Sequence, residues 1–226
     1  VKDQGAGLIV NLFFNTIMNA ALGIANTING FILLFSHNAT NPIAPQLTKS
    51  YSAKDYVRAT NLLIISNKVA YLIMYIISMP FLVETEFILK LWLGEVPPYA
   101  VLFIRLLIIE RLIDSLNNGI AEIVFANGSI SFYQISTNII RLLSVVAGYF
   151  ILSLGYPAYY LLCCYIVFST LIVLFKQISL RKIKEIDSNH ILKKSLIPSI
   201  IITIFTLPVY FIDLGIHSLL SIVIKE

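Results

Sequence analysis

Long runs of apolar residues, each bounded by polar or turn-forming residues, recur along the chain. The runs lack the strict alternation of a half-buried strand, and several reach the roughly 20 residues that a membrane-spanning helix needs. They predict spans near 6–14, 17–36, 60–83, 99–125, 130–154, 157–176, 195–212 and 215–224, of which the first and last are short enough to be truncated. The predicted fold class is an all-α integral membrane protein.

Composition supports this class, because hydrophobic residues make up 58% of the 226 residues and charged residues only 12%, against about a quarter in soluble domains. The chain begins at Val1 and its last apolar run stops at Glu226, so we expect a fragment of a longer protein. The two cysteines, Cys163 and Cys164, are adjacent in an apolar run. Neighbouring helical residues do not suit disulfide geometry, and we interpret both as packing residues.

Basic residues are concentrated in two of the predicted loops, which indicates that these loops are cytoplasmic. They are Lys49, Lys54 and Arg58 in 41–58, and Lys176, Arg181, Lys182, Lys184, Lys193 and Lys194 in 176–194. The loop at 84–98 is acidic, as expected of the opposite side. The net charge of +4 therefore reflects membrane topology, and we expect no nucleic-acid partner.

The predicted span at 99–125 carries ionisable residues where each charge costs roughly 2.5 to 3.5 kcal/mol. On a continuous helix its polar residues fall in a sector roughly 140° wide. They are Glu110, Arg111, Asp114, Asn117, Asn118 and Glu122. Arg105 points away from this sector, and we expect it to reach the headgroups.

Three further spans carry similar stripes. They are Gln134, Thr137, Asn138, Arg141, Ser144 and Gly148 in 130–154, Asn19, Gly23, Asn26 and Gly30 in 17–36, and Lys68 with Tyr71 and Tyr75 in 60–83. Four polar stripes together predict a polar lumen between the helices. The structural alternative is that Arg111 pairs with Asp114, and Arg141 with Glu110 or Glu122, only to hold helices together.

Several strings resemble a known family in their order and spacing. They are NLFFNTIMNAALGIANTING (11–30), APQLTKSYSAKD (44–55), SNK (66–68), ETEFILKLWLGEVPPY (84–99), YQI (133–135) and LGYP (154–157). They resemble the second half of Wzx-type O-antigen flippases, which are polysaccharide-biosynthesis transporters of the MOP superfamily. The MATE exporters belong to the same superfamily. The chain departs from the family pattern at Asn15, Leu22 and the turn at 127–131, so its lumen should be less cationic.

This resemblance implies that residues 1–180 form the second transmembrane bundle, truncated in its first helix, and that 195–226 form two extra C-terminal helices, also truncated. It implies a flippase that moves undecaprenyl-diphosphate-linked oligosaccharide, such as an O-antigen or capsule unit, across the bacterial inner membrane by alternating access. An N-terminal bundle of the same polypeptide would complete it. A polysaccharide polymerase is a further possible partner.

We assign expected roles on this basis. Three groups of residues are involved: Lys68, Arg111 and Arg141 for the diphosphate or acidic sugars, Asn117, Asn118, Gln134 and Asn138 for sugar hydroxyls, and Glu110, Asp114 and Glu122 for a coupling proton or for neutralising the arginines. No cofactor is expected beyond a proton or sodium gradient, and the histidines lack zinc spacing.

Other functions are open. A MATE-like, cation-coupled exporter of small molecules is the closest alternative, although it would prefer a more negative lumen. A membrane enzyme of the same pathway is disfavoured, because the acidic pair Glu84 and Glu86 lies on the predicted periplasmic side, away from soluble sugar donors. A scaffold subunit whose stripes bind partner helices is a third possibility.

Overall fold

The computed structural model describes residues 2–204, and within them the chain is helical with no strand. The helices are α1 (Lys2–Phe13), α2 (Thr16–Thr40), α3 (Ile43–Ser52), α4 (Tyr56–Val83), α5 (Thr85–Leu93), α6 (Ala100–Ser115), α7 (Ile120–Ala126), α8 (Ile130–Ser153), α9 (Tyr159–Arg181), α10 (Ser188–Ile191) and the π-helix η1 (Leu192–Leu196). Residues 197–204 continue η1 as an α-helix.

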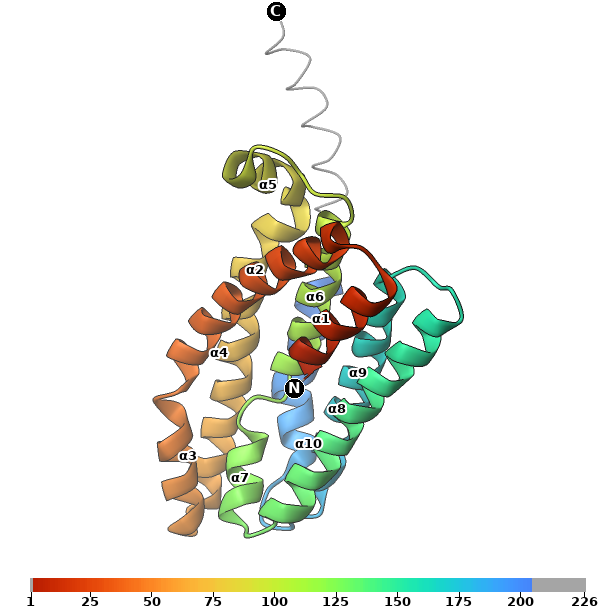
Figure 1. Cartoon of the computed structure of the whole chain (residues 1–226). Coiled ribbons are helices and arrows are strands. Elements are labelled where there is room, and N and C mark those ends of the chain that lie inside the picture. Colours follow the sequence, from red (N-terminus) through yellow and green to blue (C-terminus); the bar gives the residue numbers. More distant parts are fainter. Residues whose placement is uncertain (1, 205–226) are drawn as a thin grey trace, which may run out of the picture.

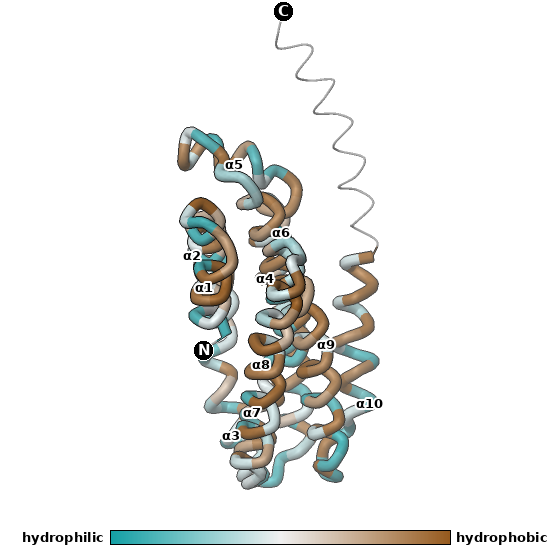
Figure 2. Tube along the Cα trace, turned by 45° about the vertical axis from the view of Figure 1, so that its right-hand side comes forward, coloured by the Kyte–Doolittle hydropathy of each residue, from teal (hydrophilic) through white to brown (hydrophobic). Residues whose placement is uncertain are grey.

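Four helices, α2, α4, α8 and α9, are long and apolar enough to cross a membrane. They coincide with the predicted spans at 17–36, 60–83, 130–154 and 157–176, and the expectation of an all-helical membrane protein is confirmed to that extent. Figure 2 shows the apolar stretches along α4, α6, α8 and α9, with hydrophilic residues concentrated near α5 and at the opposite end of the bundle.

The bundle is arranged around α6, which packs against α2, α4 and α9. The most extensive packing between two helices is that of α8 against α9, and α1 packs against both α2 and α8. In Figure 1 α5 lies at one end of the bundle, while α3, α7 and α10 lie at the other.

Buried apolar residues form two separate cores. The first core lies on the α5 side and includes Leu89, Phe103 and Tyr165, and the second lies on the side of α3 and α7 and includes Leu47 and Ile120. At five places a buried polar residue lies, in sequence order, between residues of one core and residues of the other. They are Ser36 of α2, Asn67 of α4, Asn117 after α6, Thr137 of α8 and Gln177 of α9. We call these five residues the polar layer.

The predicted continuous helix at 99–125 is wrong. α6 ends at Ser115, a turn follows, and α7 begins at Ile120. The break has a local cause, because asparagine and glycine are poor helix formers and Gly119 adopts φ +83°. A Cβ atom at Gly119 would lie 3.1 Å from Cδ1 of Leu63, so the turn also packs closely on α4. The sector of polar residues that we expected along one continuous helix therefore ends with α6 at Ser115.

Two predicted loops contain helices. The stretch at 41–58 forms α3, which buries Leu47 and Tyr51 against α4 and α7, and the stretch at 84–98 forms α5. Arg105, expected to reach the headgroups, instead donates from Nε to Thr85 Oγ1 at 3.2 Å and from Nη2 to the Val83 carbonyl at 3.3 Å. These hydrogen bonds hold α6 against the junction between α4 and α5.

The helical segment that ends at residue 204 packs against α4. The contacts are made by α10 and η1. Its helix at 197–204 overlaps the start of the extra hairpin expected at 195–226. The remainder of that hairpin lies outside the described residues.

Candidate functional site: a charged cavity inside the bundle

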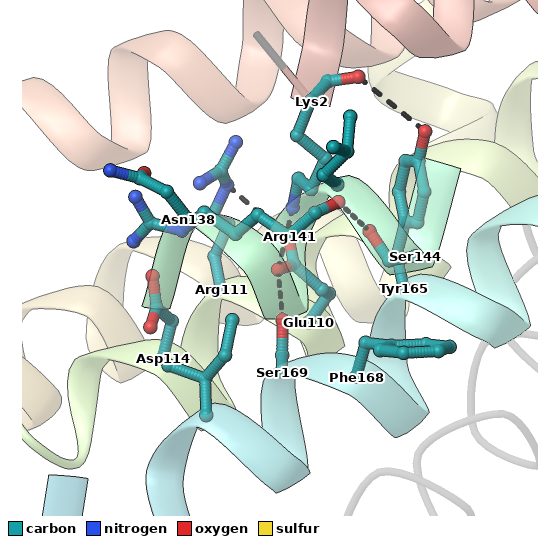
Figure 3. Close-up of a pocket in the computed structure, with 12 residues that line it drawn as sticks. Lys2, Glu110, Arg111, Asp114, Asn138, Arg141, Ser144, Tyr165, Phe168 and Ser169 are labelled. Carbon is teal, nitrogen blue, oxygen red and sulfur yellow. Dashed lines mark hydrogen bonds and ion pairs between the residues drawn. The ribbon is translucent and has the colours of Figure 1, made fainter. Parts of the chain in front are cut away.

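A cavity of about 500 Å³ lies among α1, α6, α8 and α9. We call it the charged cavity. Its lining residues are Lys2, Glu110, Arg111, Asp114, Asn138, Arg141, Leu142, Ser144, Tyr165, Phe168, Ser169 and Ile172. Figure 3 shows Lys2 and Ser169 directed at Glu110, with Arg111, Asn138 and Arg141 toward the side where Asp114 lies. The cavity therefore has a tightly paired end and a more open cationic end.

Glu110 organises the paired end. Its side chain is only 2% exposed, and Oε1 lies 2.7 Å from Nζ of Lys2. Ser169 of α9 donates a hydrogen bond to the same oxygen, and Arg111 Nε lies 3.4 Å from Oε2. The ammonium group of Lys2 also sits 5.0 Å from the centroid of the Tyr165 ring. These contacts neutralise a buried carboxylate and tie α1, α6 and α9 together.

Asp114 and Arg141 define the open end. Asp114 Oδ1 pairs with Nζ of Lys176 at 3.3 Å, and Arg141 and Arg111 are near enough to act on its charge. Among the described residues, Arg141 has no hydrogen-bond or ion-pair partner for its guanidinium group. Its side chain is exposed to the cavity, halfway along α8.

A smaller cavity of about 190 Å³ shares Arg111 and Asp114 with the charged cavity and reaches the break between α6 and α7. Glu122 and Lys176 also line it. Oε2 of Glu122 is buried and has no hydrogen-bond partner. Among the side chains that the structure describes, the two cavities present four cations, Lys2, Arg111, Arg141 and Lys176, and three carboxylates, Glu110, Asp114 and Glu122.

The structure brings most of the predicted site residues to these two cavities. Glu110, Arg111, Asp114, Asn138 and Arg141 line the charged cavity, and Asn117, Asn118 and Glu122 line the smaller one. Lys68 and Gln134 line neither. Lys68 is half-buried on α4 between the exposed side chains of Ile65 and Leu72, and Gln134 is exposed on α8. The expected convergence of Lys68 with the two arginines is therefore absent.

Two of the predicted sugar-binding amides make structural bonds. Nδ2 of Asn117 donates to the Val173 carbonyl at 2.9 Å, and its Oδ1 accepts from Nε2 of Gln177 at 2.5 Å. Nδ2 of Asn118 donates to Ser66 Oγ at 2.9 Å. These bonds hold the turn after α6 against α9 and α4. Asn138 is the amide that remains available in the charged cavity.

The pairing of charges also differs from the alternative considered from sequence. Arg111 contacts Glu110, and Asp114 pairs with Lys176 of α9. Sequence reasoning missed Lys2, because it precedes the first apolar run, and Lys176, because it was assigned to the basic loop. The signal for Lys176 was its position before further apolar residues, since α9 continues to Arg181.

Within residues 2–204 no three His, Cys, Asp or Glu side chains are grouped as metal ligands. Comparison of the chain with protein-family models, with curated proteins and with solved structures finds no match.

Proposed function

We propose that this chain is one helical bundle of a flippase that moves an anionic, lipid-linked oligosaccharide across a membrane. The observation that carries the proposal is Arg141, whose guanidinium group lies halfway along an apolar helix and has no ion-pair partner among the described side chains. A charge at that depth costs roughly 2.5 to 3.5 kcal/mol unless it faces water, a partner or a ligand. Its setting supports a hydrated pathway with affinity for anions.

The chemistry of the open end fits a phosphate or an acidic sugar. A guanidinium group binds a phosphate through two parallel hydrogen bonds, which a lysine ammonium does not match. Asn138 lies beside Arg141 in the cavity and offers hydrogen bonds to sugar hydroxyls, whereas the buried Ser144 donates to the Arg141 carbonyl at 2.7 Å. The diphosphate or sugar would contact the cavity while the prenyl chain stays in lipid.

The charge balance favours an anion over an organic cation. The sequence suggested three cations and three acids in the lumen, whereas the described side chains that line the two cavities include four cations and three carboxylates. Because Glu110 and Asp114 are already paired with lysines, Arg141 dominates the accessible end. This supports the flippase over a MATE-like exporter.

In the proposed cycle this bundle rocks against an N-terminal bundle of the same polypeptide in the bacterial inner membrane. A proton or sodium gradient would drive the cycle. The protein would not be an enzyme, and a polysaccharide polymerase could receive the product.

The proposal is tested with the full-length protein in proteoliposomes that contain undecaprenyl-diphosphate oligosaccharide. We expect Arg141→Gln to lower the flipping rate about tenfold, as the loss of a charge-assisted contact implies, and Arg141→Lys to restore part of it. Arg181→Gln, a matched change outside the cavities, should leave the rate unchanged. Wild-type flipping by Arg141→Gln, or transport of a small organic cation in place of the oligosaccharide, would overturn the proposal.

A further inference from the structure

The short helix α5 presents large apolar side chains at one end of the bundle. Phe87, Leu91 and Trp92 are 62%, 78% and 53% exposed. Thr85 and Leu89 are the buried residues of α5, which packs on α4 and α6. Several large apolar side chains that are exposed together mark an interaction site. This surface therefore needs a partner.

The exposed apolar residues share one side of α5. At about 100° of rotation per residue, Phe87, Leu91 and Trp92 fall within a sector roughly 140° wide. Glu86 and Lys90 lie outside this sector and next to each other, and their side chains pair at 2.9 Å while both remain exposed. The buried residues occupy the third side. α5 is therefore amphipathic, with a charged side that is separate from its exposed apolar side.

The length of α4 places α5 at a boundary of the membrane. α4 has 28 residues and begins among the basic residues Lys54 and Arg58. At 1.5 Å per residue it measures roughly 42 Å, whereas the hydrocarbon core is roughly 30 Å thick. α4 therefore reaches the opposite boundary, and α5 begins one residue after α4 ends. From there α5 lies across the end of the bundle rather than continuing along α4 (Figures 1 and 2).

Aromatic residues at neighbouring helix ends mark the same boundary. α6 and α9 run in parallel, because Glu110 meets Ser169 and, further along both helices, Asp114 meets Lys176. The start of α9 therefore lies level with the start of α6, which follows α5. Exposed tyrosines occupy both starts, namely Tyr99, Tyr156 and Tyr160. Tryptophan and tyrosine are enriched where a membrane meets water.

We propose that α5 is an interfacial helix that lies in the membrane boundary opposite the basic residues at the start of α4. Phe87, Leu91 and Trp92 would lie among the acyl chains, and the Glu86–Lys90 pair would lie in the headgroup layer. Helices with separate apolar and charged sides bind membranes in this orientation. Because Glu86 and Lys90 neutralise each other, burial of the apolar side rather than attraction to anionic lipids drives the binding.

Such an anchor acts on the helix that carries the charged cavity. Arg105 of α6 donates to Thr85 Oγ1 and to the Val83 carbonyl, so the start of α6 is tied to the junction of α4 and α5. Glu110 lies roughly 15 Å along α6 from Ala100, about half the thickness of the hydrocarbon core. An anchored α5 therefore holds the charged cavity at mid-depth. This inference does not depend on the proposed transport function, because it uses only the positions of the helices.

Electron paramagnetic resonance of spin labels on the full-length protein in liposomes tests the proposal. The labels are attached to single cysteines after Cys163 and Cys164 are replaced by alanine. We expect a label at Leu91→Cys to have a several-fold higher ratio of collisions with oxygen to collisions with a water-soluble nickel chelate than a label at Lys90→Cys. Lys90→Cys is the matched control, because it is the adjacent residue on the charged side of the same helix. Phe87→Cys is a second probe of the apolar side and should behave as Leu91→Cys does.

Three results would overturn the proposal. Equal ratios at Leu91→Cys and Lys90→Cys, with the nickel chelate reaching both labels, would place α5 in water. Exclusion of oxygen as well as nickel from Leu91→Cys would show that protein covers the apolar side. The ratio should be the same in phosphatidylcholine liposomes with and without phosphatidylglycerol, and a difference between the two positions that requires the anionic lipid would assign the binding to charge.

Discussion

At the scale of single residues, the most constrained charge in the bundle is the carboxylate of Glu110. It contacts Lys2 of α1, Arg111 of α6 and Ser169 of α9 while its side chain is 2% exposed. Such a network has to be complete, since removing one member leaves its partners buried and unpaired. Glu110 is thus placed to hold helices together, whereas Arg141 is placed to meet a ligand.

We therefore expect Glu110→Gln to destabilise the protein by about 3 kcal/mol, because Lys2 loses its counter-charge in a buried setting. Chemical or thermal unfolding of the purified protein in detergent measures this loss. Glu86→Gln is the control, since Glu86 pairs with Lys90 on an exposed helix face where such pairs contribute little. Equal unfolding midpoints for the two variants would contradict the structural role of Glu110.

The sequence identified some of these residues and missed others for physical reasons. Glu110, Arg111 and Arg141 were recognisable because a charge inside an apolar run is costly and requires a purpose. Lys2 and Lys176 were not recognisable as residues that line the cavities, because a lysine at the edge of an apolar run equally suits a loop. Lys68 follows the same pattern as Arg141 but lines neither cavity, since hydropathy alone does not fix the direction of a side chain.

At the scale of elements, the break between α6 and α7 shapes the smaller cavity, which Asn117, Asn118 and Gly119 line. The apolar run at 99–125 is long enough for one span, so its length predicted a continuous helix. The sequence did contain a contrary signal in Asn117, Asn118 and Gly119, which are turn formers. The four long spans were predictable because each apolar run is long and contains no cluster of turn-forming residues, whereas α3 and α5 were not, since short amphipathic helices resemble loops in a hydropathy pattern.

Gly119→Ala tests how strongly the break is fixed. Gly119 needs positive φ, and its added Cβ would press on Leu63 and Ser66 at 3.1 and 3.3 Å. We expect a loss of about 2 to 3 kcal/mol in the free energy of unfolding. Gly128→Ala is the matched control, because Gly128 also has positive φ but open space around its Cα, so it should lose only about 1 kcal/mol. A Gly119 variant no less stable than its control would show that the turn does not depend on this close packing.

At the scale of the whole molecule, two apolar cores lie on either side of a polar layer, and the charged cavity lies at the level between them. Ser36 donates to the Ala70 carbonyl and Gln177 to Asn117, so the layer also links helices. This arrangement agrees with both interpretations of the polar stripes, in which the charges either hold helices together or line a polar lumen. Paired charges hold the helices together at Glu110, while Arg141 faces open space at the other end of the cavity.

The central claim is that water reaches the charged cavity at mid-depth. The direct measurement is labelling of single cysteines in the full-length protein with a membrane-impermeant thiol reagent, after replacing Cys163 and Cys164 by alanine. Asn138→Cys, which lines the cavity, should react, and Leu143→Cys, on the same helix but not in the lining, should not. Protection of Asn138→Cys from the reagent on both sides of the membrane, during active transport as well as at rest, would contradict a hydrated cavity.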